Sequence, residues 1–567
     1  MIICGIKITH DGGVALLENG RLRFSIEVEK INNNLRYSEI ADLSMVESIL
    51  DSEHFSIRDV DQFVLDGWHG SEPFSTGEAV LHNSFRGRRQ QLKVAPYHED
   101  SIYETINERF RYNCTSALLG FGEYSSFMHG AGHIWSAYST SPFAKNMESS
   151  YVLVWDGGQY PRLYYFDTER ASILNLGSLF FFLGTIYSIF SQYFGPYKKS
   201  QTQLIEDQQW RNLEGYFGGF SVAGKIMAYI ALGKVQPHLL ALFRKVHLET
   251  FTVSADFEHR FSLEVKRRVQ KSYSDEDVLA SMHFYLQHLL LSSMEKQIQR
   301  HPNFEKNICF VGGCALNIKW NSALKSSGIF NKIWVPPFSN DSGTAIGTAA
   351  CEWYNQTKSA AIDWSVYCGP EIIKNAAAEG WIKRVCTIEN LAKLLFELGE
   401  PVVMLNGRAE AGPRALGNRS IIAPATATNM KDVINKVKQR EFFRPVAPIC
   451  LEEFVDEVFE GGFSSPYMLF EQRVRDEWKK RVPAIVHLDE TSRPQTVNKS
   501  NNILIYELLM AYYRLSNVPL LCNTSANFNG KGFFPDVFSA TSWNQLNYVW
   551  CEGVLYEKQQ KIHFELI

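Results

Sequence analysis

Two histidines four residues apart could hold a metal ion. His129 and His133 stand in the run MHGAGH. Residues four apart share one face of a helix, so both imidazoles could reach one ion. A third ligand is required, and Asp341 in PPFSNDSG is the candidate. Two alternatives stay open, because the glycines in the first run lower helix propensity and Asp341 could instead cap a helix that begins near Gly343.

Basic residues are concentrated in three stretches of the C-terminal third, GRAEAGPRALGNRS, NKVKQREFFRPVAP and TSRPQTV. Their basic side chains are Arg408, Arg414, Arg419, Lys436, Lys438, Arg440, Arg444 and Arg493. Arginine offers forked donors that match phosphate or carboxylate, and lysine a mobile point charge. Glycine, proline and phenylalanine are interleaved with them, which favours a small polyanion site over a solvated basic surface. A helix is predicted to end near Lys438, and an extended Lys438–Arg440 would put both side chains on one face.

Three apolar runs end in glycine-rich corners. They are IICGIKI before His10-Asp11-Gly12-Gly13, YVLVW before Asp156-Gly157-Gly158, and ICFV before Gly312-Gly313. Glycine lets backbone N–H groups approach an oxyanion, and a following helix N-terminus adds a favourable dipole. Each corner is equally typical of a simple turn, so both interpretations stay open.

The elements that position these residues are predicted from hydrophobic pattern. Residues 2–8, 14–18 and 21–30 read as strands, with Asn19-Gly20 as a hairpin turn. Residues 151–155 and 308–311 read as further strands, and 275–300 as a helix with one apolar face. In the last third, AAAEGW and ENLAKLLFELGE read as helical and PVVML as a strand.

Length and composition bound the class of protein. The chain has 567 residues, which favours two or three domains, and 45% hydrophobic with 21% charged residues excludes a disordered chain. The net charge of −4 disfavours a nucleic-acid coat. None of the ten cysteines forms a CxxC pair and no secretory signal is visible, which favours a reducing cytoplasm.

One uncharged segment tests whether the chain enters a membrane. Residues 171–197 are long enough for a membrane span. They carry polar residues and glycines, however, so we expect a buried core helix. The pattern loosens at residues 358–370, which we take as a linker between a domain of residues 1–357 and one of residues 371–567.

An ordered set of motifs across the chain resembles the O-carbamoyltransferases of antibiotic and nodulation-factor biosynthesis, such as the tobramycin and cephamycin carbamoyltransferases. The matching runs are His10-Asp11, MHGAGH (128–133), VWDGG (154–158), GKIM (224–227), FVGGCALN (310–317), VPPFSNDSG (335–343), GPRALGNRS (412–420), KQREFFRPVAP (438–448), SRPQTV (492–497) and CNTSAN (522–527). Any one run is common, but the ordered set is specific.

The resemblance implies an α/β protein with two activities. The first domain would have a duplicated actin-like, sugar-kinase-like fold, and the second a YrdC-like fold. The second would convert carbamoyl phosphate and ATP to carbamoyladenylate. The first would pass the carbamoyl group to a hydroxyl of a small natural product and release AMP. A homodimer is one candidate assembly, and the acceptor is left open.

The resemblance also implies residue roles. His129, His133 and Asp341 would hold a divalent ion, with iron expected. Carbamoyl phosphate and the adenylate would be bound by Arg408, Arg414, Arg419, Lys438, Arg440, Arg444, Arg493, Asn523 and Ser525. The nucleotide of the first domain, supplied with magnesium, would be surrounded by Asp156, Gly157, Gly158, Lys225, Gly312, Gly313 and Asn317.

His10 would be the general base at the acceptor hydroxyl, because an imidazole titrates near neutral pH. Its alternative is a turn histidine capped by Asp11. Two other functions stay open for the chain, a threonylcarbamoyl transferase acting on tRNA and a catalytically silent binding relative. Neither nucleic acid nor a membrane is an expected partner of the enzyme.

Overall fold

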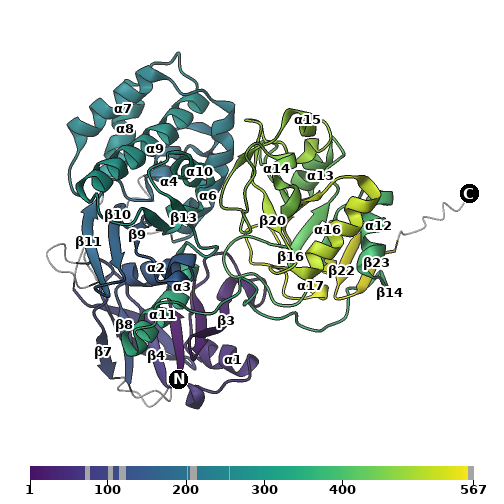
Figure 1. The fold of residues 1–567 in the computed structure, drawn as a ribbon, viewed down its shortest axis with the longest axis horizontal. Coiled ribbons are helices and arrows are strands. Elements are labelled where there is room, and N and C mark those ends of the chain that lie inside the picture. The colour runs from purple at the N-terminus through teal and green to yellow at the C-terminus, as the bar shows by residue number, and fades with distance from the viewer. Residues whose placement is uncertain are drawn as a thin grey trace, which may run out of the picture. The chain divides into compact units, whose positions relative to one another are not determined.

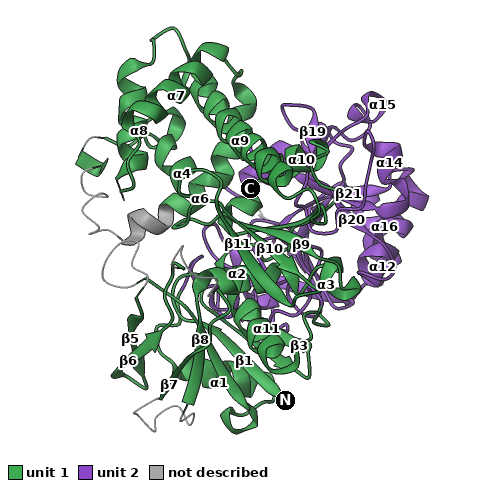
Figure 2. Cartoon of the chain, turned by 60° about the vertical axis from the view of Figure 1, so that its left-hand side comes forward, with its two compact units in different colours: residues 1–25, 39–364 green, residues 26–38, 365–567 purple. Residues whose placement is uncertain are grey.

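The chain folds into two units of mixed α/β structure. The computed structural model describes residues 1–69, 77–99, 106–113, 123–200, 202–204, 213–254 and 256–559, without the side chains of 213–218. Unit 1 comprises residues 1–25 and 39–364, and unit 2 comprises residues 26–38 and 365–567 (Figure 2). The expected domains were continuous, at 1–357 and 371–567. The structure differs in one respect, because residues 26–38 fold with the second unit.

Unit 1 contains two sheets (Figure 1), and the five strands of the second repeat the order of five of the six strands of the first. The first sheet runs β3 (Arg21–Glu27), β2 (Gly13–Glu18), β1 (Ile2–Lys7), β4 (Gln62–Asp66), β8 (Glu123–Phe127) and β7 (Phe110–Asn113). The second runs β11 (Ser172–Ser178), β10 (Arg162–Asp167), β9 (Ser150–Val154), β12 (Asn307–Val311) and β13 (Lys332–Trp334). In each, the first strand pairs antiparallel with the next along the chain and parallel with a later strand. This repetition is what a duplicated architecture predicts.

Helices α2 (His129–Tyr138) and α11 (Thr344–Thr357) pack on each other, with α11 against β1, β2 and β4 and α2 against β9 and β12. The other helices with given bounds in the described part of unit 1 are α1 (Ser44–Ser52), α3 (Pro142–Asn146), α4 (Ile186–Ser191), α6 (Leu213–Tyr229), α7 (Pro237–Thr250), α8 (Phe257–Arg268), α9 (Asp275–Arg300) and α10 (Ile318–Ser326). Strands β5 (Ala79–Phe85) and β6 (Arg88–Val94) form a separate hairpin. The pair of central helices therefore links the two sheets of this unit.

Unit 2 is built on one sheet of eight strands. Its order is β14 (Trp381–Val385), β23 (Val554–Lys558), β22 (Tyr548–Cys551), β15 (Val402–Leu405), β16 (Arg419–Ala423), β21 (Leu520–Ser525), β17 (Ala447–Leu451) and β20 (Gln495–Val497). Its helices are α12 (Ile388–Leu398), α13 (Met430–Val437), α14 (Val455–Val458), α15 (Asp476–Lys479), α16 (Ile503–Ser516) and α17 (Val537–Trp543), and β18 (Gln472–Arg473) pairs with β19 (Thr491–Ser492). Leu391, Leu395 and Leu508 lie in the core between α12, α16 and the sheet.

Most predicted elements are confirmed, but the strand predicted at 21–30 ends at Glu27, before a 3-10 helix at Val28–Lys30, and two predicted helices are wrong. The expected core helix at 171–197 is instead β11, which extends the second sheet beside β10, followed by the short α4. No described helix is long and apolar enough to cross a bilayer. The run AAAEGW is not helical, because Gly380 (φ +85°) makes a turn that leads directly into β14. The nine described cysteines are free, whereas Cys114 lies outside the described residues.

Candidate functional site

The predicted metal ligands converge in unit 1. Helix α2 begins at His129, directly after β8, and presents His133 one turn later. Asp341 opens the turn η6 (Asp341–Gly343) that leads into α11. All three side chains are buried. Oδ1 of Asp341 lies 3.5 Å from Nε2 of His129 and 3.5 Å from Nε2 of His133.

Close packing of α2 and α11 brings these ligands together. A Cβ on Gly347 would lie 1.7 Å from the carbonyl oxygen of Gly132. A Cβ on Gly132 would lie 3.0 Å from Cβ of Thr344 in α11, so this glycine of the run MHGAGH also allows the two helices to approach closely. Asp341 does not cap α11, whose N-cap is Gly343 without a side-chain bond. Its carboxylate faces the histidines, so the capping alternative is wrong.

Asp156, predicted at the nucleotide, lies with the same ligands. Its Oδ1 is 3.9 Å from Nε2 of His133. One ligand atom from each of Asp156, Asp341 and the two histidines lies within 4.8 Å of the others. The carboxylate is held by the hydroxyl of Tyr97 at 3.0 Å and the backbone N–H of Gly313 at 2.7 Å.

The donor set fits a divalent first-row cation. The Nε2 atoms of His129 and His133 face each other at 3.1 Å. Nδ1 of His129 donates to Oδ2 of Asp66 at 2.8 Å, which leaves Nε2 as the ring nitrogen that could bind a metal ion. Two imidazoles and one or two carboxylates, oriented by an outer carboxylate, are typical of protein metal centres.

Lys7 and Asp66 belong to this centre and were missed in the sequence. Nζ of Lys7 lies 2.9 Å from Asp66 and 3.0 Å from Asp341, with all three side chains buried. Burial lowers the pKa of Lys7, but the two carboxylates outweigh it and raise that pKa above its ordinary value. Burial raises the pKa of Asp341, but Lys7 and His129 hold it well below the usual range. A lysine inside the apolar run IICGIKI was the available signal.

The charge of His129 depends on the same carboxylates. Burial lowers its pKa, but Asp66 and Asp341 together raise the pKa to about 9. Without a bound cation, the centre therefore favours an imidazolium among its carboxylates. A metal ion would take the place of that positive charge.

His10 lies at the edge of the centre. Its Nδ1 is 3.3 Å from Oδ2 of Asp11, and its Nε2 is 3.5 Å from Oδ2 of Asp341. The ring packs edge-on to Trp68, with centroids 5.2 Å apart. The contact with Asp11 is thus present, and the other nitrogen faces the metal ligands.

Two of the three glycine corners meet. Parallel pairing of β9 with β12 sets Val154 beside Val311, so the corners that follow these strands adjoin. Gly312 has φ +93°, and a Cβ there would lie 2.4 Å from the carbonyl oxygen of Trp155. Gly157 accepts a hydrogen bond from the backbone of Thr185. Two further residues that were predicted to surround the nucleotide, Gly158 and Asn317, lie within or shortly after these two corners.

Gly158 lies against Tyr97, because a Cβ there would be 3.0 Å from the Tyr97 hydroxyl. Asn317 caps α10, accepting from the backbone N–H groups of Lys319 and Trp320 at 3.2 and 3.3 Å. The side chain of Asn317 thus stabilises the start of α10.

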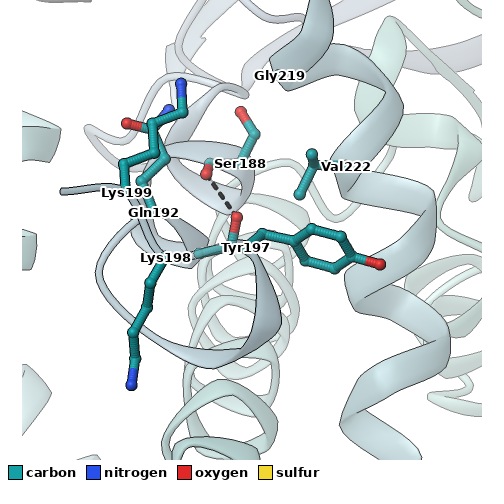
Figure 3. A pocket seen from close by; sticks show the side chains of 8 residues that line it. Ser188, Gln192, Tyr197, Lys198, Lys199, Gly219 and Val222 are labelled. Atoms are coloured by element: carbon teal, nitrogen blue, oxygen red, sulfur yellow. Dashed lines mark hydrogen bonds between the residues drawn. The ribbon is translucent and has the colours of Figure 1, made fainter. Parts of the chain in front are cut away.

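Lys225 lies beside a separate cavity of unit 1. The cavity, of about 290 Å³, lies between α4 and α6 and is lined by Lys198, Lys199 and Val222 among others (Figure 3). Nζ of Lys225 is 5.4 Å from the ring centroid of Tyr197, which also lines it. The structure therefore associates Lys225 with this cavity.

Four arginines of unit 2 form what we call the arginine cluster, namely Arg414, Arg440, Arg444 and Arg493. Burial and the neighbouring guanidinium Arg444 lower the pKa of Arg440 to about 9, and burial with Arg444 and Arg440 lowers that of Arg493 to about 10. Burial, Arg493 and Arg444 also lower the pKa of Arg414. Nη2 of Arg440 and Nε of both Arg414 and Arg493 are buried without a hydrogen-bond partner in the described part of the chain. Such a concentration of like charge and open donors suits a polyanion.

Lys438, Ser525 and Asn523 organise the loops around this cluster. The Lys438 ammonium donates to the carbonyls of Ser525 and Asn527 at 2.8 Å each and to Oδ1 of Asn527 at 2.6 Å. Asn523 donates to the carbonyl of Ala415 at 3.1 Å, beside Arg414. Gln439 has φ +49°, so Lys438 and Arg440 are joined by a turn. The expected extended conformation is wrong, whereas the helix end near Lys438 is confirmed.

Two residues that were predicted to bind carbamoyl phosphate and the adenylate, Arg419 and Arg408, contact neighbouring loops of unit 2 instead of joining the arginine cluster. The Arg419 guanidinium donates to the carbonyls of Asn406, Asn418, Gly407 and Pro370 at 2.7 to 3.2 Å and is buried. Arg408 lies 3.4 Å from Glu371 and donates to the carbonyl of Cys368. These contacts bind the loop after β15 to residues 368–371.

Comparison with known proteins covers both units. A family model described as carbamoyltransferase N-terminus matches residues 2–351, and one described as carbamoyltransferase C-terminus matches residues 392–558. Nodulation protein U of Sinorhizobium fredii is 42% identical over 98% of this chain and 99% of its own, and that of Rhizobium tropici is 43% identical over 99% and 96%. The 3'-hydroxymethylcephem-O-carbamoyltransferase of Streptomyces clavuligerus is 29% identical over 96% and 97%.

Proposed function

The chain belongs to the carbamoyltransferase family, and we propose that it is an ATP-dependent O-carbamoyltransferase. Unit 2 would form carbamoyladenylate from carbamoyl phosphate, water and ATP, releasing phosphate and pyrophosphate. Unit 1 would transfer the carbamoyl group to a hydroxyl, which loses its proton while AMP leaves. The name of the cephem relative, which specifies transfer to a hydroxymethyl oxygen, supports a small natural product as acceptor.

The arginine cluster is the observation that carries this proposal. Both substrates of the first step are polyanions, and so are both of its leaving products. Buried guanidinium groups that lower one another's pKa are stabilised by an anion, and their open donors would bind phosphoryl oxygens. Lys438 and Asn523 would serve this step by fixing the loops that carry the arginines.

In unit 1, His129, His133, Asp341 and Asp156 would hold a divalent ion, iron in our proposal. The ion would supply Lewis-acid stabilisation of the phosphate of the leaving AMP. Asp66 would orient His129, and Lys7 would balance the carboxylates. His10, facing the edge of this centre, would accept the proton of the acceptor hydroxyl.

The duplicated strand order of unit 1 supports an actin-like, sugar-kinase-like fold for the transfer unit. We propose a YrdC-like fold for unit 2 and a nucleotide site at the joined corners of Asp156 and Gly312. The fold assignment is not required for the chemistry above, whereas the transfer step requires the adenylate to bind beside the residues that would hold the ion.

Exchange of labelled pyrophosphate into ATP, dependent on carbamoyl phosphate and without acceptor, tests the first step. Arg440→Ala should lower the exchange rate at least about a hundredfold, because it removes a buried guanidinium that would donate hydrogen bonds to a phosphate group. The matched control is Arg384→Ala in β14, whose side chain is 61% exposed and pairs with Glu557. Equal exchange by the two variants would contradict the proposal. Exchange that requires threonine in place of carbamoyl phosphate would instead support a threonylcarbamoyl transferase.

A further inference from the structure

A segment from near the N-terminus is built into unit 2. Residues 26–38 fold with residues 365–567. The buried Lys30 ammonium donates to Glu27 at 2.6 Å and to the carbonyls of Glu410 and Gly412 at 2.7 Å each. Glu27 in turn accepts from the backbone N–H of Gly412 at 2.7 Å. One end of the segment is therefore fixed to the loop that carries Arg414.

The other end is fixed to the turn that holds Lys438. Leu35 bridges Lys531, and the backbone N–H of Arg36 donates to the carbonyl of Gly530 at 3.0 Å. Asn34 accepts from the backbone N–H of Gly532 at 3.0 Å. This turn starts at Asn527, the principal partner of Lys438.

Arg36 thus lies between the loop that carries Arg414 and the turn that holds Lys438. Its Nη2 donates to the carbonyl of Pro413 at 3.5 Å, next to Arg414 in the chain. Its Nε is 3.9 Å from Glu29, a looser contact, and its side chain is 32% exposed. Burial and Arg493, with Arg36 next, lower the pKa of Arg414, and burial, Arg440 and Arg36 lower that of Lys438. The Arg36 charge is therefore felt by both groups.

We propose that Arg36 is a fifth anion-binding arginine of the cluster, brought to it by residues 26–38, and that it binds a phosphate group of the substrates of unit 2. This inference rests on the proposed function of the arginine cluster. It gives the N-terminal segment a direct part in the chemistry of the C-terminal unit. Guanidinium geometry suits this task, since two donors can bind two oxygens of one phosphate.

Titration calorimetry of the full chain with inorganic pyrophosphate tests the proposal. Arg36→Ala should raise the Kd about tenfold, and Arg440→Ala should raise it as well, while the exposed control Arg384→Ala should stay within about twofold of the wild type. If Arg36→Ala matches the control while Arg440→Ala is weakened, Arg36 is not a ligand and the proposed function stands. If neither cluster variant is weakened, the proposed function fails together with this inference.

A second measurement uses the wild-type chain, so it does not depend on whether the Arg36→Ala variant folds. In the wild-type chain, phenylglyoxal modifies accessible arginines, and peptide mass analysis reports each site. Pyrophosphate should slow the modification of Arg36 at least about fivefold and leave Arg384 unchanged, because only a bound anion shields the guanidinium. Equal modification of Arg36 with and without pyrophosphate would overturn the proposal.

Discussion

Nδ1 of His129 donates a hydrogen bond of 2.8 Å to Asp66, and this bond determines that Nε2 of His129 faces His133 and Asp341. Oδ2 of Asp66 also accepts from Lys7 at 2.9 Å and from the hydroxyl of Thr344 at 3.1 Å. One carboxylate thus connects β1, β4, α2 and the start of α11. Its position makes Asp66 the organiser of the centre.

Asp66→Asn should weaken metal binding about 10- to 100-fold, because an amide orients the imidazole less firmly and makes it less basic. Titration of the apoprotein with Fe²⁺ or Co²⁺ measures this affinity. Asp363→Asn is the control, since that side chain is 77% exposed and pairs with exposed Arg21. An unchanged affinity in Asp66→Asn would exclude the orienting role.

The contact between Gly132 and Gly347 predicts a second effect on the centre. In Gly347→Ala the added methyl group would overlap the Gly132 carbonyl, so α2 and α11 must separate. We expect a loss of stability of about 1–3 kcal/mol, typical of overpacking, together with weaker metal binding. Urea unfolding and metal titration measure the two effects.

Gly219→Ala in α6 provides the comparison, because no atom of the described residues lies within 4 Å of its Cβ position. This variant should be as stable as the wild type or more so, since alanine favours the helix. Equal metal affinity in the two glycine variants would show that the helix contact does not position Asp341.

The sequence predicted that His129 and His133 would face each other, because spacing and residue type are local signals. Lys7 inside an apolar run was a signal, but the sequence could not show its partner Asp66, because only the pairing of β1 with β4 brings the two side chains together. The packing role of Gly132 could not be seen in the sequence for a related reason. Helix propensity is local, whereas the value of a missing Cβ depends on a helix more than 200 residues later.

In unit 2, sequence composition predicted the basic cluster but not the function of each member. Arg419 and Lys438 have the residue types of anion ligands, yet their donors are used by backbone carbonyls. Such partners are set by loop conformation, which side-chain chemistry does not specify. Arg36 was overlooked because it lies 378 residues before Arg414, the first member of the cluster in the sequence.

The buried pair of Glu27 and Lys30 predicts strong coupling. Lys30→Met leaves the Glu27 carboxylate buried without its cation, which should cost about 3–5 kcal/mol of folding stability. The double variant Glu27→Gln, Lys30→Met should recover part of this loss, because no uncompensated charge remains. Urea unfolding of the two single variants and the double variant gives the coupling energy. Additive effects would contradict a direct role for the pair.

Glu258 predicts how stability depends on pH. Burial raises its pKa from 4.5 to about 7, although one carboxylate oxygen accepts from the backbone N–H of Leu183 at 2.9 Å. The folded state therefore binds its proton more tightly than the unfolded state. Its stabilising contribution is complete below about pH 4.5 and is lost as the pH rises through 7.

Glu258→Gln keeps an acceptor for Leu183 and removes the ionisable group. The variant should match the wild type near pH 5 and be more stable at pH 8, by up to about 3 kcal/mol. Thermal unfolding across this pH range measures the difference, with exposed Glu507→Gln in α16 as the control. A constant difference between pH 5 and pH 8 would show that Glu258 does not titrate in this range.

Substitution of His10 distinguishes the two proposed steps, because it should slow carbamoyl transfer and leave adenylate formation unchanged. Its Nε2 faces Asp341 in unit 1, whereas the arginine cluster belongs to unit 2. His10→Gln should therefore slow carbamoyl transfer to a hydroxyl acceptor about 10²- to 10⁴-fold, the usual contribution of a general base. Pyrophosphate exchange without acceptor should stay at the wild-type rate, and exposed His238→Gln in α7 should retain both activities. If His10→Gln also loses the exchange reaction, then the imidazole acts in adenylate formation, and the assignment of proton transfer to unit 1 is wrong.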